Sequence, residues 1–204
     1  LKRLEEGRDM DEWYLREWAG VDTANGSPLW YTTDENGKRT TTDSYNKADR
    51  VYCGSAAPKF TGGWMNSFSY KGFTLTANFD FVYGNLLYNQ SRELLDSDGA
   101  YADYNSMKLK SGWKRWEKEG DIATHPKAIN GGNKNSNKSS SRYLEKGNYF
   151  SLRNLSLGYS IPEKLCGKLG LQRVNVSCSA DNLFTLTPFS GVSPQLSDSS
   201  TDGY

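Results

Sequence analysis

Apolar and polar residues alternate with a period of two along several stretches of the chain. The most regular stretch is FTLTANFDFVY, residues 73–83, in which every odd position is apolar and four of the five intervening residues are polar. Successive side chains of a strand point to opposite faces, so this pattern predicts a strand with one apolar and one polar face. The apolar face fits either the inside of a soluble sandwich or the lipid side of a membrane barrel.

The same pattern predicts five strands, over residues 10–19, 60–70, 73–83, 149–161 and 173–184. In the fourth of these, the apolar positions change parity between Leu152 and Leu155. A β-bulge near Arg153–Asn154 would restore the alternation, because one extra residue exchanges the two faces. Alternatively, the upper part of this strand stands above a membrane, where both faces pack on loops.

The connections between these strands differ greatly in length. Lys71–Gly72 predicts a two-residue hairpin turn, and the short segment after Pro162 predicts one helical turn. Asp181–Phe184 resembles a turn at a strand end, because Asn tolerates unusual backbone angles. The connections over residues 20–59 and 84–147 are much longer, and long loops at one end with tight turns at the other are typical of an outer-membrane barrel.

Within the second long loop, INGGNKNSNKSSSR, residues 129–142, has almost no apolar side chains. Such a segment buries too little apolar surface to offset the entropy of ordering, so we expect a mobile, solvated loop tip.

The composition narrows the function classes. The 204 residues include 25 Lys and Arg against 24 Asp and Glu, which gives no charge excess that indicates nucleic acid. No run approaches 18 apolar residues, so no transmembrane helix is expected. The chain begins at Leu1 without an apolar signal segment, from which we expect an internal fragment of a longer protein.

Few residues suit catalysis or metal binding. The three cysteines lack the paired spacing of a zinc site, and His125, the single histidine, is expected at the surface of a polar loop. A Ser–His–Asp or multi-histidine site is therefore hard to build. We expect no enzyme activity, no cofactor and no metal.

A barrel in lipid places polar side chains inward, around a hydrated lumen. Aromatic residues gather toward the ends of the predicted strands, where interface girdles lie in outer-membrane barrels. The candidate lumen-facing residues on the polar faces are Asp80, Arg173 and Asp181. They line the passage in one interpretation, and form charge pairs within the hydrated lumen in the other.

Four stretches, in order and at matching spacing, resemble the C-terminal barrel segment of SusC/RagA-type TonB-dependent outer-membrane transporters. The stretches are EWYLREWAGVDTANGSPLWY (residues 12–31), GSAAPKFTGGWMNSFSYKGFTLTANFDFVYG (54–84), RYLEKGNYFSLRNLSLGYSIPEKL (142–165) and RVNVSCSADNLFTLTPFSGVSPQ (173–195). The family's signal peptide, TonB-contacting segment and globular plug have no counterpart here, nor has a closing strand.

The resemblance implies an all-β fold: an antiparallel up-and-down transmembrane β-barrel segment of about five strands. Residues 1–204 would form the C-terminal part of the barrel, with extracellular loops near 20–59, 84–147 and 185–204 and short periplasmic turns. It implies import of an oligosaccharide or a peptide across the outer membrane of a Gram-negative bacterium. The implied partners are membrane lipid, a SusD-like surface lipoprotein, and TonB–ExbB–ExbD acting through the missing plug.

Aromatic residues in the polar loops are candidate contacts for the substrate or for the lipoprotein lid. They are Trp30, Tyr31, Trp113 and Trp116. The alternative is that these rings fasten loops to one another or to the lid, since aromatic residues also dominate protein interfaces.

Three other functions are weighed against a transporter. A secreted β-sandwich, such as a carbohydrate-binding module, would be a soluble folded protein of this length. An outer-membrane enzyme would need a catalytic constellation, which the residues do not supply. A passive porin would lack a plug and a TonB-contacting segment.

Overall fold

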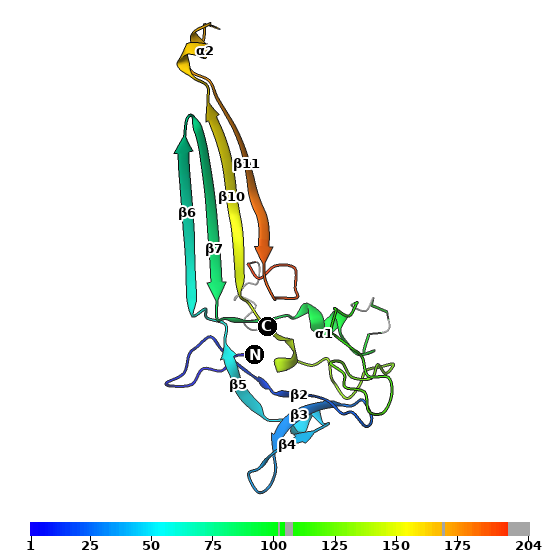
Figure 1. Ribbon diagram of the computed structural model, residues 1–204. Helices are drawn as coiled ribbons and strands as arrows, with labels where there is room; N and C mark the ends of the chain where they lie inside the picture. The colour runs from blue at the N-terminus through cyan, green and yellow to red at the C-terminus, as the bar shows by residue number, and fades with distance from the viewer. Residues whose placement is uncertain (102, 105–107, 169, 196–204) are drawn as a thin grey trace. The chain divides into compact units, whose positions relative to one another are not determined.

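The computed structural model describes residues 1–101, 103–104, 108–168 and 170–195, and the chain divides into two compact units (Figure 1). The sheet unit comprises Pro58–Asn85 and Lys146–Phe189. The loop unit comprises, among the described residues, Leu1–Ala57, Leu86–Glu145 and residues 190–195. Within the described residues, no helix is long and apolar enough to cross a membrane.

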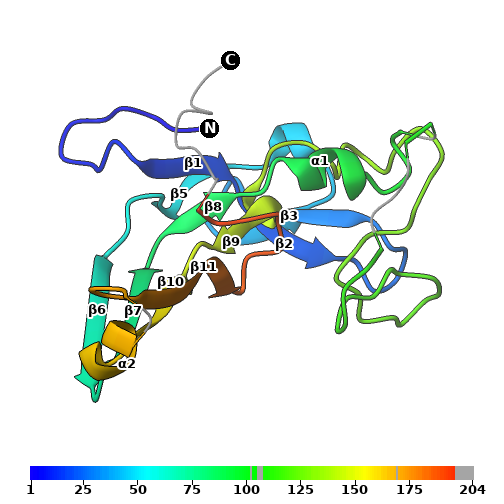
Figure 2. The ribbon, with the colours of Figure 1, turned by 90° about the horizontal axis from the view of Figure 1, so that it is seen from above.

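The sheet unit is one antiparallel sheet with the strand order β11–β10–β7–β6. Its long strands lie side by side in Figure 1, and Figure 2 views them from one end. The strands are β6 (Phe60–Tyr70), β7 (Phe73–Tyr83), β10 (Tyr149–Ser160) and β11 (Asn175–Leu186). Helix α2 (Glu163–Lys168) joins β10 to β11, which confirms the helical turn expected after Pro162. Four of the five predicted strands are therefore present within two residues of their expected ends.

The turn between β6 and β7 is the predicted two-residue hairpin. Lys71 and Gly72 have φ angles of 46° and 86°. Positive φ at both central positions is the signature of a type I′ turn, whose twist matches that of the flanking strands. The turn therefore fixes the register that pairs Tyr70 with Phe73 and Phe60 with Tyr83.

The predicted bulge in β10 is also present. Leu152 pairs with Phe79 and Asn154 with Asn78, so Arg153 has no counterpart on β7. The register with β11 shifts at the same place, and there Asn182 has a φ of 52°. The positive φ of this Asn agrees with the sequence, but the expected strand-end turn is wrong, since the residue lies inside β11 opposite the bulge.

The loop unit contains short strands and helical turns. Its elements are β1 (Glu12–Arg16), β2 (Trp18–Val21), β3 (Pro28–Thr33), β4 (Arg39–Thr42), η1 (Tyr45–Lys47), β5 (Arg50–Ser55), β8 (Leu86–Tyr88), α1 (Ser91–Leu95), η2 (Ser141–Tyr143) and β9 (Leu144–Lys146), of which β9 ends at the boundary with the sheet unit. Strand β1 pairs with β5, β8 pairs with β9, and β2, β3 and β4 form a sheet.

The strand predicted over residues 10–19 is wrong as a single long element. It is divided at Glu17 into β1 and β2, which pair with different partners. The Glu17 carbonyl accepts a hydrogen bond from Tyr31, while the Trp18 amide donates to Ser141 Oγ. A period-two pattern records only which side chains are buried, and it does not show that the partner strand changes halfway.

Residues 129–142 do not form the solvated loop tip that their composition predicts. Ser136 and Ser140 are completely buried, and Asn133 and Arg142 are buried as well. Asn133 Nδ2 donates to the carbonyls of Gly26 and Lys127. Hydrogen bonds made by small polar side chains hold this segment, a contribution that a scale based on apolar burial leaves out.

Candidate functional site

The sheet of β6, β7, β10 and β11 has one face that is almost entirely apolar, which we call the apolar sheet face. Along its centre, Phe73, Leu75, Ala77, Phe79 and Phe81 of β7 pair with Tyr159, Leu157, Leu155, Leu152 and Phe150 of β10. Much of this face is uncovered: Trp64 and Phe68 are each 63% exposed, and Leu157 is 51% exposed. An exposed apolar patch of this extent marks a surface that meets lipid or another protein.

The opposite face of the same sheet is polar. Thr74, Thr76, Asn78 and Asp80 of β7 pair there with Gly158, Ser156, Asn154 and Ser151 of β10. A sheet with one apolar and one polar face, and strands of 11 or 12 residues, has the dimensions and patterning of a barrel wall between lipid and a hydrated lumen.

Two of the candidate lumen residues lie on this polar face. The Asp80 carboxylate forms an ion pair with Arg153 Nε at 2.9 Å and accepts a hydrogen bond from the Tyr149 hydroxyl at 3.1 Å. Asp181 accepts a hydrogen bond from Asn154 at 2.7 Å. The Asp80–Arg153 ion pair agrees with the interpretation of charge pairs within the lumen, whereas the partner of Asp181 is a neutral amide. A role of either residue in lining a passage stays a prediction. Arg173 lies before the first residue of β11 and is exposed, so the structure does not bring it onto the polar face.

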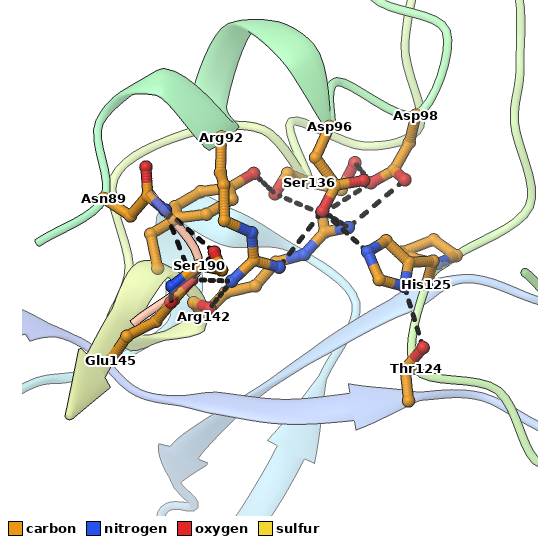
Figure 3. Close-up of polar contacts among 12 residues, drawn as sticks. Asn89, Arg92, Asp96, Asp98, Thr124, His125, Ser136, Arg142, Glu145 and Ser190 are labelled. Carbon is orange, nitrogen blue, oxygen red and sulfur yellow. Dashed lines mark hydrogen bonds and ion pairs between the residues drawn. The ribbon is translucent and has the colours of Figure 1, made fainter. Parts of the chain in front are cut away.

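The loop unit holds a buried ionic cluster that the sequence did not predict (Figure 3). Three arginines and three carboxylates balance in charge around a histidine. The members are Arg92, Asp96, Asp98, Arg115, His125, Arg142 and Glu145. Charges removed from water need partners of opposite sign and further hydrogen bonds. Every charge of this cluster has a partner of opposite sign, while Arg92 Nε, Asp96 Oδ1 and Arg142 Nε have no hydrogen-bond partner among the described residues.

Arg142 and Asp98 lie at the centre of the ionic cluster. Arg142 Nη1 and Nη2 approach the two Asp98 oxygens at 2.5 and 3.2 Å, a fork-shaped pairing that an arginine makes and a lysine cannot. Arg115 Nη1 lies 2.7 Å from the same carboxylate, and Ser136 Oγ donates to it at 2.7 Å. Burial by itself lowers the pKa of the Arg142 guanidinium, but the charges of Asp98 and Asp96, the hydrogen bond to Asp98 and the nearby Tyr143 together outweigh it and raise the pKa.

Asp96 is the second carboxylate of the ionic cluster, and its side chain is 1% exposed. His125 Nε2 lies 2.7 Å from Asp96 Oδ2, and the Arg92 guanidinium lies 3.1 Å from the same oxygen. Burial would raise the pKa of the Asp96 carboxyl. The hydrogen bond with His125 and the charges of Arg142 and Arg92 act in the opposite direction and lower the pKa to about 2.

The ionic cluster also fastens the chain near Ser190. Arg92 Nη1 lies 3.0 Å from Glu145 Oε1, and this carboxylate accepts hydrogen bonds at 2.6 Å from both the amide and the hydroxyl of Ser190. Asn89 Nδ2 donates to the Ser190 hydroxyl at 2.9 Å. Segments more than one hundred residues apart in the sequence therefore meet at one set of charges.

His125 is 1% exposed, so its expected surface position is wrong. Its Nδ1 lies 2.8 Å from Thr124 Oγ1, and its Nε2 contacts Asp96, an order of groups that resembles a hydroxyl–histidine–acid triad. Thr124 Oγ1 also bonds to both backbone groups of Lys114, and the imidazole is closed off from solvent. The arrangement orients a structural histidine and gives a substrate no access, so no catalytic role follows from it.

The structure places the four aromatic candidates within the loop unit. Trp30 is completely buried and packs edge-on against Trp18 and Tyr45. Trp116 is also buried, and its indole donates to the Thr23 carbonyl at 3.0 Å. These two side chains fasten loops together, and Trp30 presents no exposed surface to a ligand.

Tyr31 and Trp113 are only half-buried. The Arg39 guanidinium lies 3.7 Å from the centre of the Tyr31 ring. The Trp113 ring lies 5.0 Å from the His125 ring, and the Arg92 guanidinium lies 4.5 Å from its centre. A role of either residue in contacting a substrate or a lid stays a prediction.

Sequence reasoning missed the ionic cluster because its charges lie far apart along the chain. The local signal was the DSDG stretch, residues 96–99, in which two carboxylates precede a glycine inside a polar loop that also carries the single histidine. This signal identifies residues that need partners, but it does not show which of the 25 Lys and Arg residues provide them. The described residues contain no group of three or more His, Cys, Asp or Glu side chains arranged to hold a metal ion.

No family model matches the chain. The chain is 30% identical over 210 residues to TonB-dependent receptor P3 of Formosa agariphila, which covers 94% of this chain and 19% of the relative. It is 32% identical over 151 residues to TonB-dependent receptor P39 of the same organism, covering 72% of this chain and 14% of the relative. Both relatives are TonB-dependent receptors.

The chain also matches solved structures. The RagAB peptide transporter matches with a TM-score of 0.73 and 28% identity over 90% of this chain and 20% of that chain. The RagAB peptide importer in the open-open state matches with a TM-score of 0.73 and 25% identity over 95% of this chain and 22% of that chain. The chain thus spans about a fifth of the length of the proteins it matches. In sequence and in fold, the chain belongs to the SusC/RagA-type TonB-dependent receptors.

Proposed function

We propose that this chain forms part of the wall, the lumen lining and the extracellular loops of a SusC-like transporter that imports an oligosaccharide or a peptide across the outer membrane. The observation that carries the proposal is the two-faced sheet, in which an uncovered apolar face lies opposite a polar one. In hydrocarbon every backbone group needs a partner, so the edges of β6 and β11 would pair with further strands of a closed barrel.

The long connections would then be extracellular loops near residues 20–59, 84–147 and 185–204, and residues 1–204 the C-terminal part of the barrel. These segments supply most of the loop unit, which has its own buried residues and its own ionic cluster. Loops folded to this degree present side chains in fixed positions, as a binding surface requires.

The partners follow from the same proposal. A SusD-like surface lipoprotein would cover the loops, and TonB–ExbB–ExbD would deliver energy through a plug domain. In support, the matched relatives carry the name TonB-dependent receptor, and the matched solved structures are a transporter and an importer of peptides. The proposal has no step of covalent chemistry and no nucleic acid as partner.

The alternative of a secreted β-sandwich has less support. A sandwich buries the apolar face of its sheet beneath a second sheet. The described residues of the sheet unit form one sheet, and Trp64, Phe68 and Leu157 on its apolar face are more than half exposed. Such a face in water would be an aggregation hazard, whereas against lipid it has a function.

The proposal can be tested on the native polypeptide that carries this chain. Outer membranes are extracted with a mild detergent, and the protein is run on a gel unboiled and boiled. We expect a heat-shifted band several times heavier than 22.9 kDa, together with a co-purifying lipoprotein. A soluble species near this mass, without a heat shift, would contradict the proposal and favour the sandwich.

Uptake provides the second half of the test. Cells that produce the receptor are given labelled oligosaccharides or labelled peptides, with and without a protonophore that removes the energy source of TonB. We expect accumulation that depends on the proton gradient. Accumulation that is equal in both conditions would indicate a passive porin instead.

A further inference from the structure

The loop unit contains an open hollow of about 370 Å³ that is separate from the ionic cluster and from the four aromatic candidates. Its lining combines two aromatic rings with a carboxylate, an amide and two small residues. The lining residues are Ala100, Tyr101, Asp103, Tyr104, Asn130 and Gly131. This volume lies within the usual range for a small-ligand pocket.

Two chain segments form the walls of this hollow, and backbone hydrogen bonds tie them together. The Ile129 amide donates to the Asp98 carbonyl and the Gly131 amide donates to the Gly99 carbonyl, each at 3.0 Å. Gly99 has a φ of 91°, and a Cβ at this position would lie 2.3 Å from the Ile129 carbonyl oxygen. Only glycine therefore permits the two segments to approach this closely.

The ionic cluster also fixes these two segments, through the buried side chain of Asp98. The Asp98 carboxylate, completely buried, is held by Arg142, Arg115 and Ser136. Since the backbone of Asp98 carries one wall and bonds to the other, the buried charges hold the hollow in its shape. A preorganised site loses less entropy when a ligand binds.

The aromatic part of the lining faces solvent. Tyr101 and Tyr104 are 41% and 60% exposed, and their ring centres lie 5.5 Å apart with a 50° angle between the planes. Two splayed rings offer apolar faces on which a flat ligand can rest, and tyrosine does this at a low entropic cost because it has only two side-chain torsions.

The polar part of the lining consists of exposed hydrogen-bonding groups. Asp103 and Asn130 are exposed, and among the described residues neither side chain has a hydrogen-bond partner. The carboxylate accepts hydrogen bonds, and the amide both donates and accepts them. A ligand with an apolar ring face and several hydroxyl groups around its edge would use both kinds of surface.

We propose that this hollow is a binding subsite for one ring of a neutral oligosaccharide. The inference rests on the proposed function of an importer, and it chooses between the two substrate classes named there. A peptide that binds by adding a strand needs an exposed sheet edge, and the lining residues lie in turns and loops rather than in strands. An acidic sugar would bring its charge close to Asp103, and like charges repel.

The test measures binding to the intact receptor, purified with its lipoprotein in detergent. The probes are maltohexaose, xylohexaose and laminarihexaose as neutral sugars, an alginate hexamer as an acidic sugar, and a set of hexapeptides.

One double variant, Tyr101→Ala with Tyr104→Ala, removes both rings. A second, Tyr101→Phe with Tyr104→Phe, keeps the rings and removes the hydroxyls. As a matched control, Tyr52→Ala disrupts a different pair of tyrosine rings in the loop unit, in which the ring centres of Tyr14 and Tyr52 lie 4.9 Å apart.

We expect the unmodified receptor to bind at least one neutral probe. The double alanine variant should weaken this binding by roughly tenfold, because it removes both ring faces on which the sugar rests. The double phenylalanine variant and Tyr52→Ala should remain within about threefold of the unmodified receptor, because the rings of the hollow are still present.

Three results would overturn the inference. In the first, the double alanine variant binds the neutral sugar as tightly as the unmodified receptor does. In the second, the double alanine variant loses affinity only for the peptides or only for the alginate hexamer. In the third, the unmodified receptor binds none of the neutral probes. In each case the heat shift is measured on the same preparation, and proton-dependent uptake is measured on the cells from which the receptor was purified. If these persist, the proposed importer stands and the subsite fails. If they are absent as well, both proposals fail.

Discussion

Arg142 and Asp98, which are 44 residues apart in the sequence, form a two-pronged ion pair whose side chains are 3% and 0% exposed. Asp98 follows helix α1, and Arg142 lies in η2 at the end of a polar segment with few apolar side chains. The buried ion pair therefore holds this loop in its folded structure, a role that buried apolar side chains have in most loops and domains. It also explains how a glycine- and asparagine-rich segment keeps a defined structure.

Replacing Arg142 with methionine should unfold the loop locally. Breaking a buried ion pair from one side costs about 3–5 kcal/mol, because the remaining carboxylate stays buried without its partner. Hydrogen exchange, measured by mass spectrometry on the receptor in detergent, should show loss of protection over residues 129–143. The control is Arg39→Met, which removes the pair between Arg39 and Glu17, whose side chains are 60% and 33% exposed. Exposed pairs contribute little, so equal effects of the two substitutions would contradict the central role of Arg142.

Acid should loosen the same loop within a defined pH range. The folded-state pKa of Asp96 is about 2, below its ordinary value of 3.8. A lowered pKa means that the charged carboxylate stabilises the fold above pH 3.8, and that this contribution, on the order of 2 kcal/mol, is lost as the pH falls toward 2. Pepsin should therefore cleave within residues 84–147 faster at pH 2 than at pH 4.

The variant Asp96→Asn provides the control for the acid experiment. It cannot lose a charge, so its cleavage rate within this loop should already be high at pH 4 and should change less between pH 4 and pH 2. An unmodified receptor whose loop is cleaved equally at both values would show that Asp96 does not carry the acid response.

The sheet was predictable from the sequence because its determinants are local. Alternation over residues 73–83 defines both faces of β7, and Lys71–Gly72 defines the turn and the register. Even the bulge at Arg153 follows from a change of parity, since only an inserted residue reconciles Leu152 and Leu155 with the same face. Each of these inferences uses residues within a few positions of one another.

The loop unit was not predictable in the same way, because its interior depends on distant partners. His125 was expected at the surface, yet it is buried against Asp96, 29 residues away. Nothing in the residues next to His125 indicates that partner. Charged residues in polar loops usually remain solvated, so the pattern alone favours the wrong environment for each member of the ionic cluster.

The two faces of the sheet should tolerate a charge very differently. Leu157 lies on the apolar face opposite Leu75, and its neighbour Ser156 lies on the polar face opposite Thr76. A lysine on the lipid face near the bilayer centre costs about 2–4 kcal/mol, whereas a lumen position tolerates it. In refolding from urea into detergent or lipid, Leu157→Lys should lower the yield of the heat-shifted form, and Ser156→Lys should not. The reverse order would place lipid on the other face.

Gly99 offers a test of the hollow that leaves every lining side chain unchanged. A methyl group at this position meets the Ile129 carbonyl oxygen at 2.3 Å, so Gly99→Ala should push the two walls apart and weaken binding of the neutral probe. The matched control is Gly120→Ala in the same loop, where φ is 85° and a Cβ would have no heavy atom within 4 Å. Both substitutions strain the backbone at a similar positive φ, so a difference between them reports the close contact alone. If Gly99→Ala binds the sugar as well as Gly120→Ala does, the shape of the hollow does not depend on the approach of the two segments, and its role as a preorganised subsite is wrong.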